Sequence, residues 1–264
     1  MMQTHTFSIK DALLFPFQML IKRPLLFFMM LVIAIAIPFI HHNVLIYKIK
    51  AFIFTHCEDE LAVAHMLTKL FPVFTLLTII KASIVNCLLT AIAISFYRTG
   101  TAPFKTVIAS LKYIPLYAIL NFIFSELPPL AAYSMIDIVS IPKFATRYSM
   151  LIVAVAMTAL LSRFMLYPFF LIDKKSGIKS AIASFHATRN NYLKITALAF
   201  AFFGVQILTQ LLNPKLAAIF SRFFTAQGFN PLTIALMIPV IVIAHIALVY
   251  STCGFAYAYG KLTE

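Results

Sequence analysis

Residues 24–47 read PLLFFMMLVIAIAIPFIHHNVLIY and contain no Asp, Glu, Lys or Arg. About 20 mostly apolar residues in a helix cross the roughly 30 Å hydrocarbon core of a bilayer, so this stretch is long and apolar enough to span a membrane. A β-barrel strand is disfavoured, because barrel strands alternate polar and apolar residues, whereas this run is apolar on every side. The stretch therefore predicts a transmembrane helix.

The rest of the chain has the same character. Of its 264 residues, 62% are hydrophobic and 11% are charged, whereas a soluble domain is about half apolar and about a quarter charged. No polar half is left to form a separate soluble domain, so the composition excludes a soluble enzyme and predicts one integral membrane domain over 1–264. The net charge of +13 is explained by membrane topology and anionic lipid, and we expect no nucleic-acid partner.

Five further apolar stretches predict an all-α protein with six transmembrane helices. The predicted spans are Pro24–Tyr47, Leu70–Tyr97, Leu111–Tyr133, Tyr148–Ile172, Ile195–Asn213 and Pro231–Tyr257. With the N-terminus inside, twelve Lys and Arg residues fall in the inner segments and seven in the outer ones. The positive-inside rule therefore predicts that both termini face the cytoplasm.

A short pattern before each odd-numbered span is the most specific feature of the sequence. It reads IKDAL at 9–13, FKTVI at 104–108 and IKSAI at 178–182. In the second and third copies the apolar residues continue to Leu111 and Phe185 with the spacing i, i+3, i+4, i+7, which forms one stripe along a helix. Each copy therefore predicts an amphipathic helix that lies in the cytoplasmic interface.

The polar flanks of these helices predict contact with lipid phosphate. Lys10, Lys105 and Lys179 occupy equivalent positions, and a lysine at the inner interface is attracted to anionic headgroups. Ser110 and Ser184 are expected on the same polar flanks. The predicted partners are therefore membrane lipids with anionic headgroups on the cytoplasmic side.

Each surface helix and the two spans after it form one unit. The chain then divides into three parallel repeats over about 7–97, 103–172 and 177–260. The plainer explanation is chance recurrence, because any loop before a span has a mixed character and the match covers only five to eight residues.

Residues 163–189, RFMLYPFFLIDKKSGIKSAIASFHATR, carry a family resemblance. The shared elements are Arg163 and Pro168 near a span end, an apolar approach to Asp173, and then Gly177, Ala181, Ser184 and Thr188 before a basic or Asn-rich start of the next span. The segment resembles the YciC-type bacterial inner-membrane proteins and the membrane domain attached to some glycerophosphodiester phosphodiesterases. The resemblance implies six transmembrane helices in the bacterial inner membrane. It implies little biochemistry, and no phosphodiesterase catalytic domain is present to carry that activity over.

Several polar residues fall inside the predicted spans, where a charge at a helix centre costs about 2.5–3.5 kcal/mol. At 1.5 Å per residue, Lys81 and Glu126 lie about 16 and about 10 Å below the outer surface, close enough in depth to pair. Arg163 lies about 22 Å deep, at nearly the depth of His245. Together with Asn86 these residues would line a path for an anion or for protons. This alternative function is a small-solute transporter or channel.

The plainer interpretation of the same residues is structural. One ion pair and a snorkelling arginine would hold the bundle in register, with Asn86 and Asn121 in interhelical hydrogen bonds. This interpretation is favoured, because a charged relay through a membrane usually has more than one carboxylate.

Metal binding is not predicted. The loop after the first span and its flanks contain four histidines, which are His41, His42, His56 and His65. His56 and Glu60 are four residues apart and would share one helix face, but a zinc site needs three or four ligands and this spacing matches no known ligand signature. We expect a solvated acidic loop and no cofactor.

The motifs of common enzymes are absent. The sequence has no Walker A loop, GxGxxG, HExxH or GxSxG. We therefore expect a non-enzymatic membrane protein that acts as a lipid-contacting scaffold or accessory component. A membrane protein partner is compatible with that role.

Overall fold

The computed structural model describes residues 6–41, 48–49, 53, 55, 60–127, 152, 155–174, 176–202 and 231–264. Within these ranges every regular element is a helix. Among the described residues, four stretches are long and apolar enough to cross a membrane: Thr68–Thr99, Phe104–Phe124, Val155–Asp173 and Val242–Thr263. A fifth crossing results if the bent pair α1 and α2 is counted as one span. The all-helical class is confirmed, and the helices fit a membrane protein.

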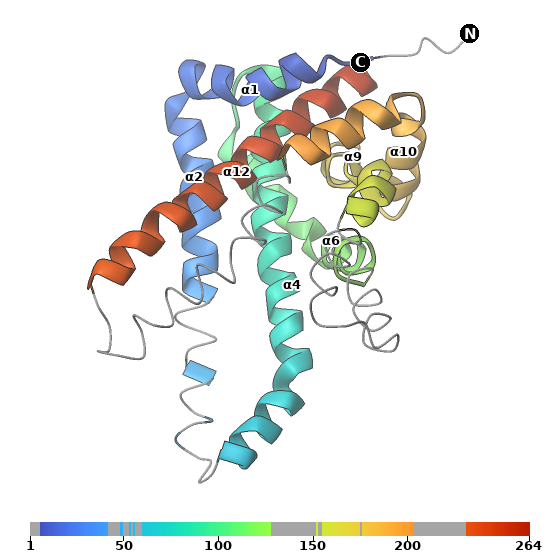
Figure 1. Cartoon of the computed structure of the whole chain (residues 1–264). Helices are drawn as coiled ribbons and strands as arrows, with labels where there is room; N and C mark the ends of the chain where they lie inside the picture. The colour runs from blue at the N-terminus through green and yellow to red at the C-terminus, as the bar shows by residue number, and fades with distance from the viewer. Residues whose placement is uncertain are drawn as a thin grey trace.

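The chain begins with two consecutive helices that meet at a sharp angle. α1 (Ile9–Lys22) and α2 (Pro24–Ile40) are bent by 109° relative to each other, so that α1 lies across one end of the bundle while α2 runs along it (Figure 1). The bend falls at Arg23, whose φ of −144° and ψ of 66° are not helical. A residue before a proline avoids the helical region, which explains why the helix breaks just before Pro24.

The remaining elements follow in chain order. They are α4 (Glu60–Thr99), α5 (Phe104–Ala109), η2 (Ser110–Tyr113), α6 (Ile114–Asn121), η3 (Phe122–Glu126), η4 (Ser162–Phe164), α9 (Tyr167–Asp173), α10 (Lys179–Thr188), η5 (Arg189–Asn191) and α12 (Pro231–Thr263). Residues 192–202 continue as a helix after η5. α12 crosses α2 and α4 diagonally and ends near α1 (Figure 1).

The inner face of α1 packs against α12. The hydroxyl of Tyr250 on α12 donates a hydrogen bond to the carbonyl of Leu13. The Sγ atom of Cys253 lies 3.5 Å from Sδ of Met19 on α1 and 4.0 Å from Sδ of Met30 on α2. These three sulfur-bearing side chains are fully buried, so α1 is fixed to the core along one side.

Two glycines allow α12 to approach its neighbours closely. A Cβ atom at Gly254 would lie 2.7 Å from Cε2 of Phe202 and 3.0 Å from the carbonyl oxygen of Ala12. A Cβ atom at Gly260 would lie 2.6 Å from Cδ1 of Tyr97. Small residues at helix crossings permit this kind of contact in membrane proteins. The close packing of α12 against α1 and α4 therefore requires residues without a side chain at positions 254 and 260.

The second unit differs from its predicted boundary. The segment 104–111 was expected to be a surface helix separate from the third span, but Phe104–Phe124 is a single candidate crossing. The predicted start of the third span at Leu111 is therefore not confirmed. Pro115 occupies the first turn of α6, where its missing N–H is not needed, and Ile114 before it stays helical at φ −52° and ψ −48°. The chain has no break here comparable to the one at Arg23.

Two other boundaries can be compared with the prediction. α12 continues to Thr263, past the predicted end of the sixth span at Tyr257, because no proline or positive φ interrupts it there. The fifth predicted span, Ile195–Asn213, extends beyond residue 202 and so lies partly outside the described residues.

Candidate functional site

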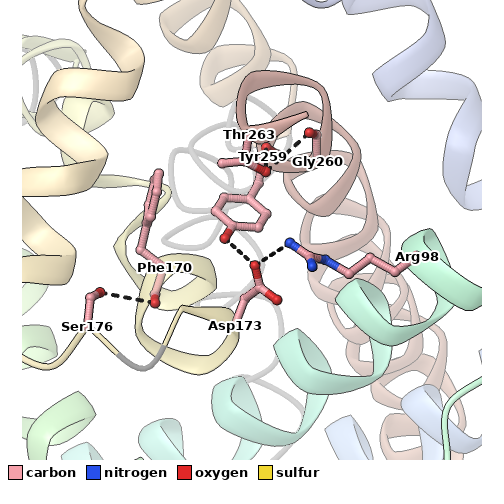
Figure 2. Close-up of polar contacts among 7 residues, drawn as sticks. All are labelled: Arg98, Phe170, Asp173, Ser176, Tyr259, Gly260 and Thr263. Carbon is pink, nitrogen blue, oxygen red and sulfur yellow. Dashed lines mark hydrogen bonds and ion pairs between the residues drawn. The ribbon is translucent and has the colours of Figure 1, made fainter.

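A polar cluster joins the ends of three helices that correspond to the second, fourth and sixth predicted spans (Figure 2). Arg98 near the end of α4 donates a hydrogen bond of 2.5 Å to Oδ2 of Asp173, the last residue of α9. The hydroxyl of Tyr259 on α12 donates a second hydrogen bond of 2.5 Å to the same oxygen. The side chain of Asp173 is 11% exposed and Tyr259 is 1% exposed, so the carboxylate lies largely out of water.

The backbone around this cluster is held by hydroxyl groups. Oγ of Ser176 donates to the carbonyl of Phe170 at 3.2 Å, and Oγ1 of Thr263 donates to the carbonyl of Tyr259 at 3.0 Å (Figure 2). Charge-assisted hydrogen bonds such as those at Asp173 are about twice as strong as neutral ones. The arrangement neutralises one acid with one cation and joins the ends of three helices. Its geometry is that of a structural contact between helices.

Further polar contacts tie neighbouring segments to the same end of the bundle. The hydroxyl of Tyr97 donates to Oε1 of Glu264 at 2.5 Å, and Nζ of Lys261 donates to Oε2 at 2.7 Å. Nζ of Lys194 donates to the carbonyl of Phe7 at 3.1 Å. The segment before α1 is therefore attached to the helix over 192–202.

A pocket of about 420 Å³ opens between α1 and the end of α4. It is lined by Phe15, Gln18, Lys22, Arg23, Phe96, Tyr97 and Gly100. The ring centroid of Phe15 lies 5.6 Å from that of Phe96 and 5.7 Å from that of Tyr97, so one wall of the pocket is aromatic. Lys22 and Arg23 are exposed. We name this the elbow pocket, because it lies at the bend between α1 and α2.

The three lysines predicted to contact lipid phosphate are all exposed. Lys10 lies on α1, Lys105 on α5 and Lys179 on α10. The apolar residues beside Lys105 and Lys179 show the same pattern of exposure in both copies. Phe104, Ile108, Ile178 and Ile182 are exposed, whereas Val107 and Ala181 are buried. Each helix thus presents an apolar edge and a lysine on its surface.

The predicted placement of Ser110 and Ser184 on the polar flanks is wrong, since both are buried. Oγ of Ser110 donates to the carbonyl of Val107 at 2.6 Å and to that of Cys87 at 3.4 Å. Oγ of Ser184 donates to the carbonyl of Arg163 at 2.7 Å. The interhelical acceptors lie 23 and 21 residues upstream of the two serines. A hydroxyl that faces protein in an apolar environment needs such a partner.

Two of the predicted intramembrane residues have aromatic partners. The guanidinium carbon of Arg163 lies 4.7 Å from the ring centroid of Phe185 and 4.9 Å from that of Tyr192, within the range of cation–π attraction. Asn86 on α4 lies near the hydroxyl of Tyr117 on α6. These contacts join neighbouring helices.

The other three predicted intramembrane residues are placed as follows. Lys81 and His245 are half-buried on α4 and α12. Glu126 ends η3, and its side chain lies outside the described residues. The predicted pair of Lys81 with Glu126 therefore stays a prediction.

The histidine-rich loop can be followed only in part. His42 and His56 lie outside the described residues, whereas His41 and His65 lie within them. In the portion of the chain that is described, no three His, Cys, Asp or Glu residues are grouped to hold a metal ion.

Comparison of the chain with protein-family models, with curated proteins and with solved structures finds no match. The resemblance to the YciC-type proteins therefore stays a prediction.

The sequence analysis predicted neither the polar cluster around Asp173 nor the elbow pocket. The signal for the polar cluster is the pair of opposite charges at the ends of two predicted spans, Arg98 and Asp173. The signal for the elbow pocket is two adjacent cations directly before a proline at a span start, Lys22 and Arg23.

Proposed function

We propose that this chain is a six-span protein of the bacterial inner membrane that acts, without enzymatic activity, as a lipid-contacting scaffold or accessory component. Both termini face the cytoplasm, and the surface helices contact anionic lipid of the inner leaflet.

The geometry of α1 is the observation that carries this proposal. α1 meets α2 at 109° and exposes Phe17 and Ile21 together with Lys10 and Lys22. A helix in the membrane interface has this composition, with apolar side chains that enter the acyl region and lysines that meet the headgroups. Burial of its inner face against α12 keeps the exposed face in a fixed orientation.

The second and third units support a repeated architecture. Ser110 and Ser184 stand at equivalent positions and each bonds to a carbonyl of the preceding predicted span. The exposed apolar pairs beside Lys105 and Lys179 also match. In the first unit the serine position is held by Phe15, which is buried in the aromatic wall of the elbow pocket. Parallel units of this kind direct all three lysines to one leaflet.

Charge reversal of the three lysines tests the proposal. The variant Lys10→Glu/Lys105→Glu/Lys179→Glu is compared with the control Lys10→Arg/Lys105→Arg/Lys179→Arg, which keeps the charges. Native mass spectrometry from mixed vesicles measures how much phosphatidylglycerol and phosphatidylcholine each protein retains. We expect the reversal to lower phosphatidylglycerol retention, since each basic residue near an anionic surface contributes about 1 kcal/mol. Unchanged retention would contradict the proposal.

A further inference from the structure

The elbow pocket has hydrogen-bond donors beside its aromatic wall. Lys22 and Arg23 contribute two cations and Gln18 contributes an amide, while none of the seven lining residues is an acid. Arginine and lysine are the side chains that bind phosphate oxygens, and arginine can do so with two parallel hydrogen bonds. The lining therefore suits an anion of the phosphate type.

The local electrostatic balance favours an anion. α1 and α4 both end beside the pocket, and each helix C-terminus contributes about half a negative charge. Two full positive charges on Lys22 and Arg23 exceed this sum. Glu264, which accepts a hydrogen bond from Tyr97 of the pocket, is paired with Lys261. The pocket thus keeps a net positive charge.

Apolar side chains on both sides of the two cations indicate the rest of the ligand. Ile21 is 80% exposed and Leu25 is 85% exposed. Exposed apolar residues continue along α2 at Phe28 and Val32, with spacings of three and four residues that follow one face of a helix. An anionic group held by Arg23 would therefore lie at the start of a helix with an exposed apolar face, which favours a lipid over a free anion.

We propose that the elbow pocket binds the phosphodiester headgroup of one anionic glycerophospholipid, whose acyl chains run along α2. This inference rests on the proposed lipid-contacting function and adds a defined site to it. Lys22 and Arg23 contact the phosphate oxygens, Gln18 donates to the headgroup, and the aromatic wall excludes water from one side.

Matched variants test the site. The variant Lys22→Gln/Arg23→Gln removes two charges at the pocket, and the control Lys174→Gln/Arg189→Gln removes two exposed charges elsewhere. A third variant, Gln18→Trp, fills the pocket and keeps every charge. All five positions are exposed, and circular dichroism in detergent verifies the helical content. Native mass spectrometry during a phosphatidylglycerol titration then gives the Kd of the first lipid bound.

The site predicts that Lys22→Gln/Arg23→Gln raises this Kd by about fivefold for each charge removed. It also predicts that Gln18→Trp raises the Kd and that the control leaves it unchanged. If both charge variants raised the Kd equally and Gln18→Trp had no effect, the pocket would not be the lipid site. The result would instead indicate diffuse electrostatic attraction of lipid. No preference of the unmodified protein for phosphatidylglycerol over phosphatidylcholine would overturn the proposed function as well. Displacement of the lipid by millimolar inorganic phosphate would overturn the assignment to a lipid and indicate a free anion.

Discussion

Arg98 on α4 and Asp173 on α9 are 75 residues apart in the sequence and meet at 2.5 Å. Tyr259 on α12 donates to the same carboxylate oxygen, so one acid connects three helices. The cation is 43% exposed, whereas the phenol is buried. The contribution of the cluster to stability is therefore expected to come more from the phenol than from the ion pair, because exposed ion pairs contribute at most about 1 kcal/mol.

Replacement of Asp173 by alanine should lower the free energy of unfolding by about 1–3 kcal/mol, since it leaves a buried donor without its acceptor. Thermal unfolding in detergent measures the change. The double variant Asp173→Ala/Tyr259→Phe should lose less than the sum of the single variants, because it removes donor and acceptor together. Strictly additive losses would show that the two groups do not interact. Glu264→Gln serves as a control in an exposed ion pair.

Alanine at Gly254 or Gly260 should destabilise the protein by about 1–3 kcal/mol, which is the usual cost of overpacking. At Gly254 the added carbon meets Phe202 and the backbone of Ala12, and at Gly260 it meets the ring of Tyr97. The same thermal unfolding experiment detects the loss. Ile243→Ala, at an exposed position of the same helix, should change little. A neutral Gly254→Ala would show that α12 does not pack against α1 as described.

Substitution of Arg163 distinguishes a structural arginine from a transport residue. Arg163→Gln should reduce stability by about 0.5–2 kcal/mol through loss of the contacts with Phe185 and Tyr192, and Arg163→Lys should lose less. Solute uptake into proteoliposomes is measured in parallel under several ion gradients. We expect no flux in the unmodified protein. A flux that Arg163→Gln abolishes in a folded protein would instead support the transporter.

Cysteine labelling tests the orientation of the surface helices. In a background where Cys57 is replaced by serine, single cysteines at Lys10, Lys105 and Lys179 should react with a membrane-impermeant maleimide only from the cytoplasmic side. Cys87 and Cys253 are buried and should stay unlabelled in the folded protein. Reaction of any of the three positions from the periplasmic side would contradict the parallel units.

Composition and hydropathy predicted the helical class, because about 20 apolar residues in succession have few alternatives to a membrane helix. The bend at Arg23 also follows from local sequence, since it depends on the next residue being proline. Local sequence does not determine where the third span begins, because Pro115 falls in the first turn of α6 and does not interrupt the chain.

The functional features depend on contacts between distant residues, which a single sequence does not reveal. A serine can lie either on an exposed polar flank or in the protein interior. Only the packed structure shows that Ser110 and Ser184 are buried. The elbow pocket requires the ends of α1 and α4 to meet, and that meeting is set by the aromatic contacts of Phe15. The residue types at these places were visible, but their proximity was not.

The hydrogen bond from Tyr250 to the carbonyl of Leu13 spans 237 residues. At translation rates of about 5–20 residues per second, α1 leaves the ribosome tens of seconds before its covering helix is synthesised. During that interval the face that carries Met19 has no cover from α12. Nascent α1 therefore has an apolar face that α12 does not yet cover, and other apolar groups, from a chaperone or from lipid, must shield this face until α12 is made.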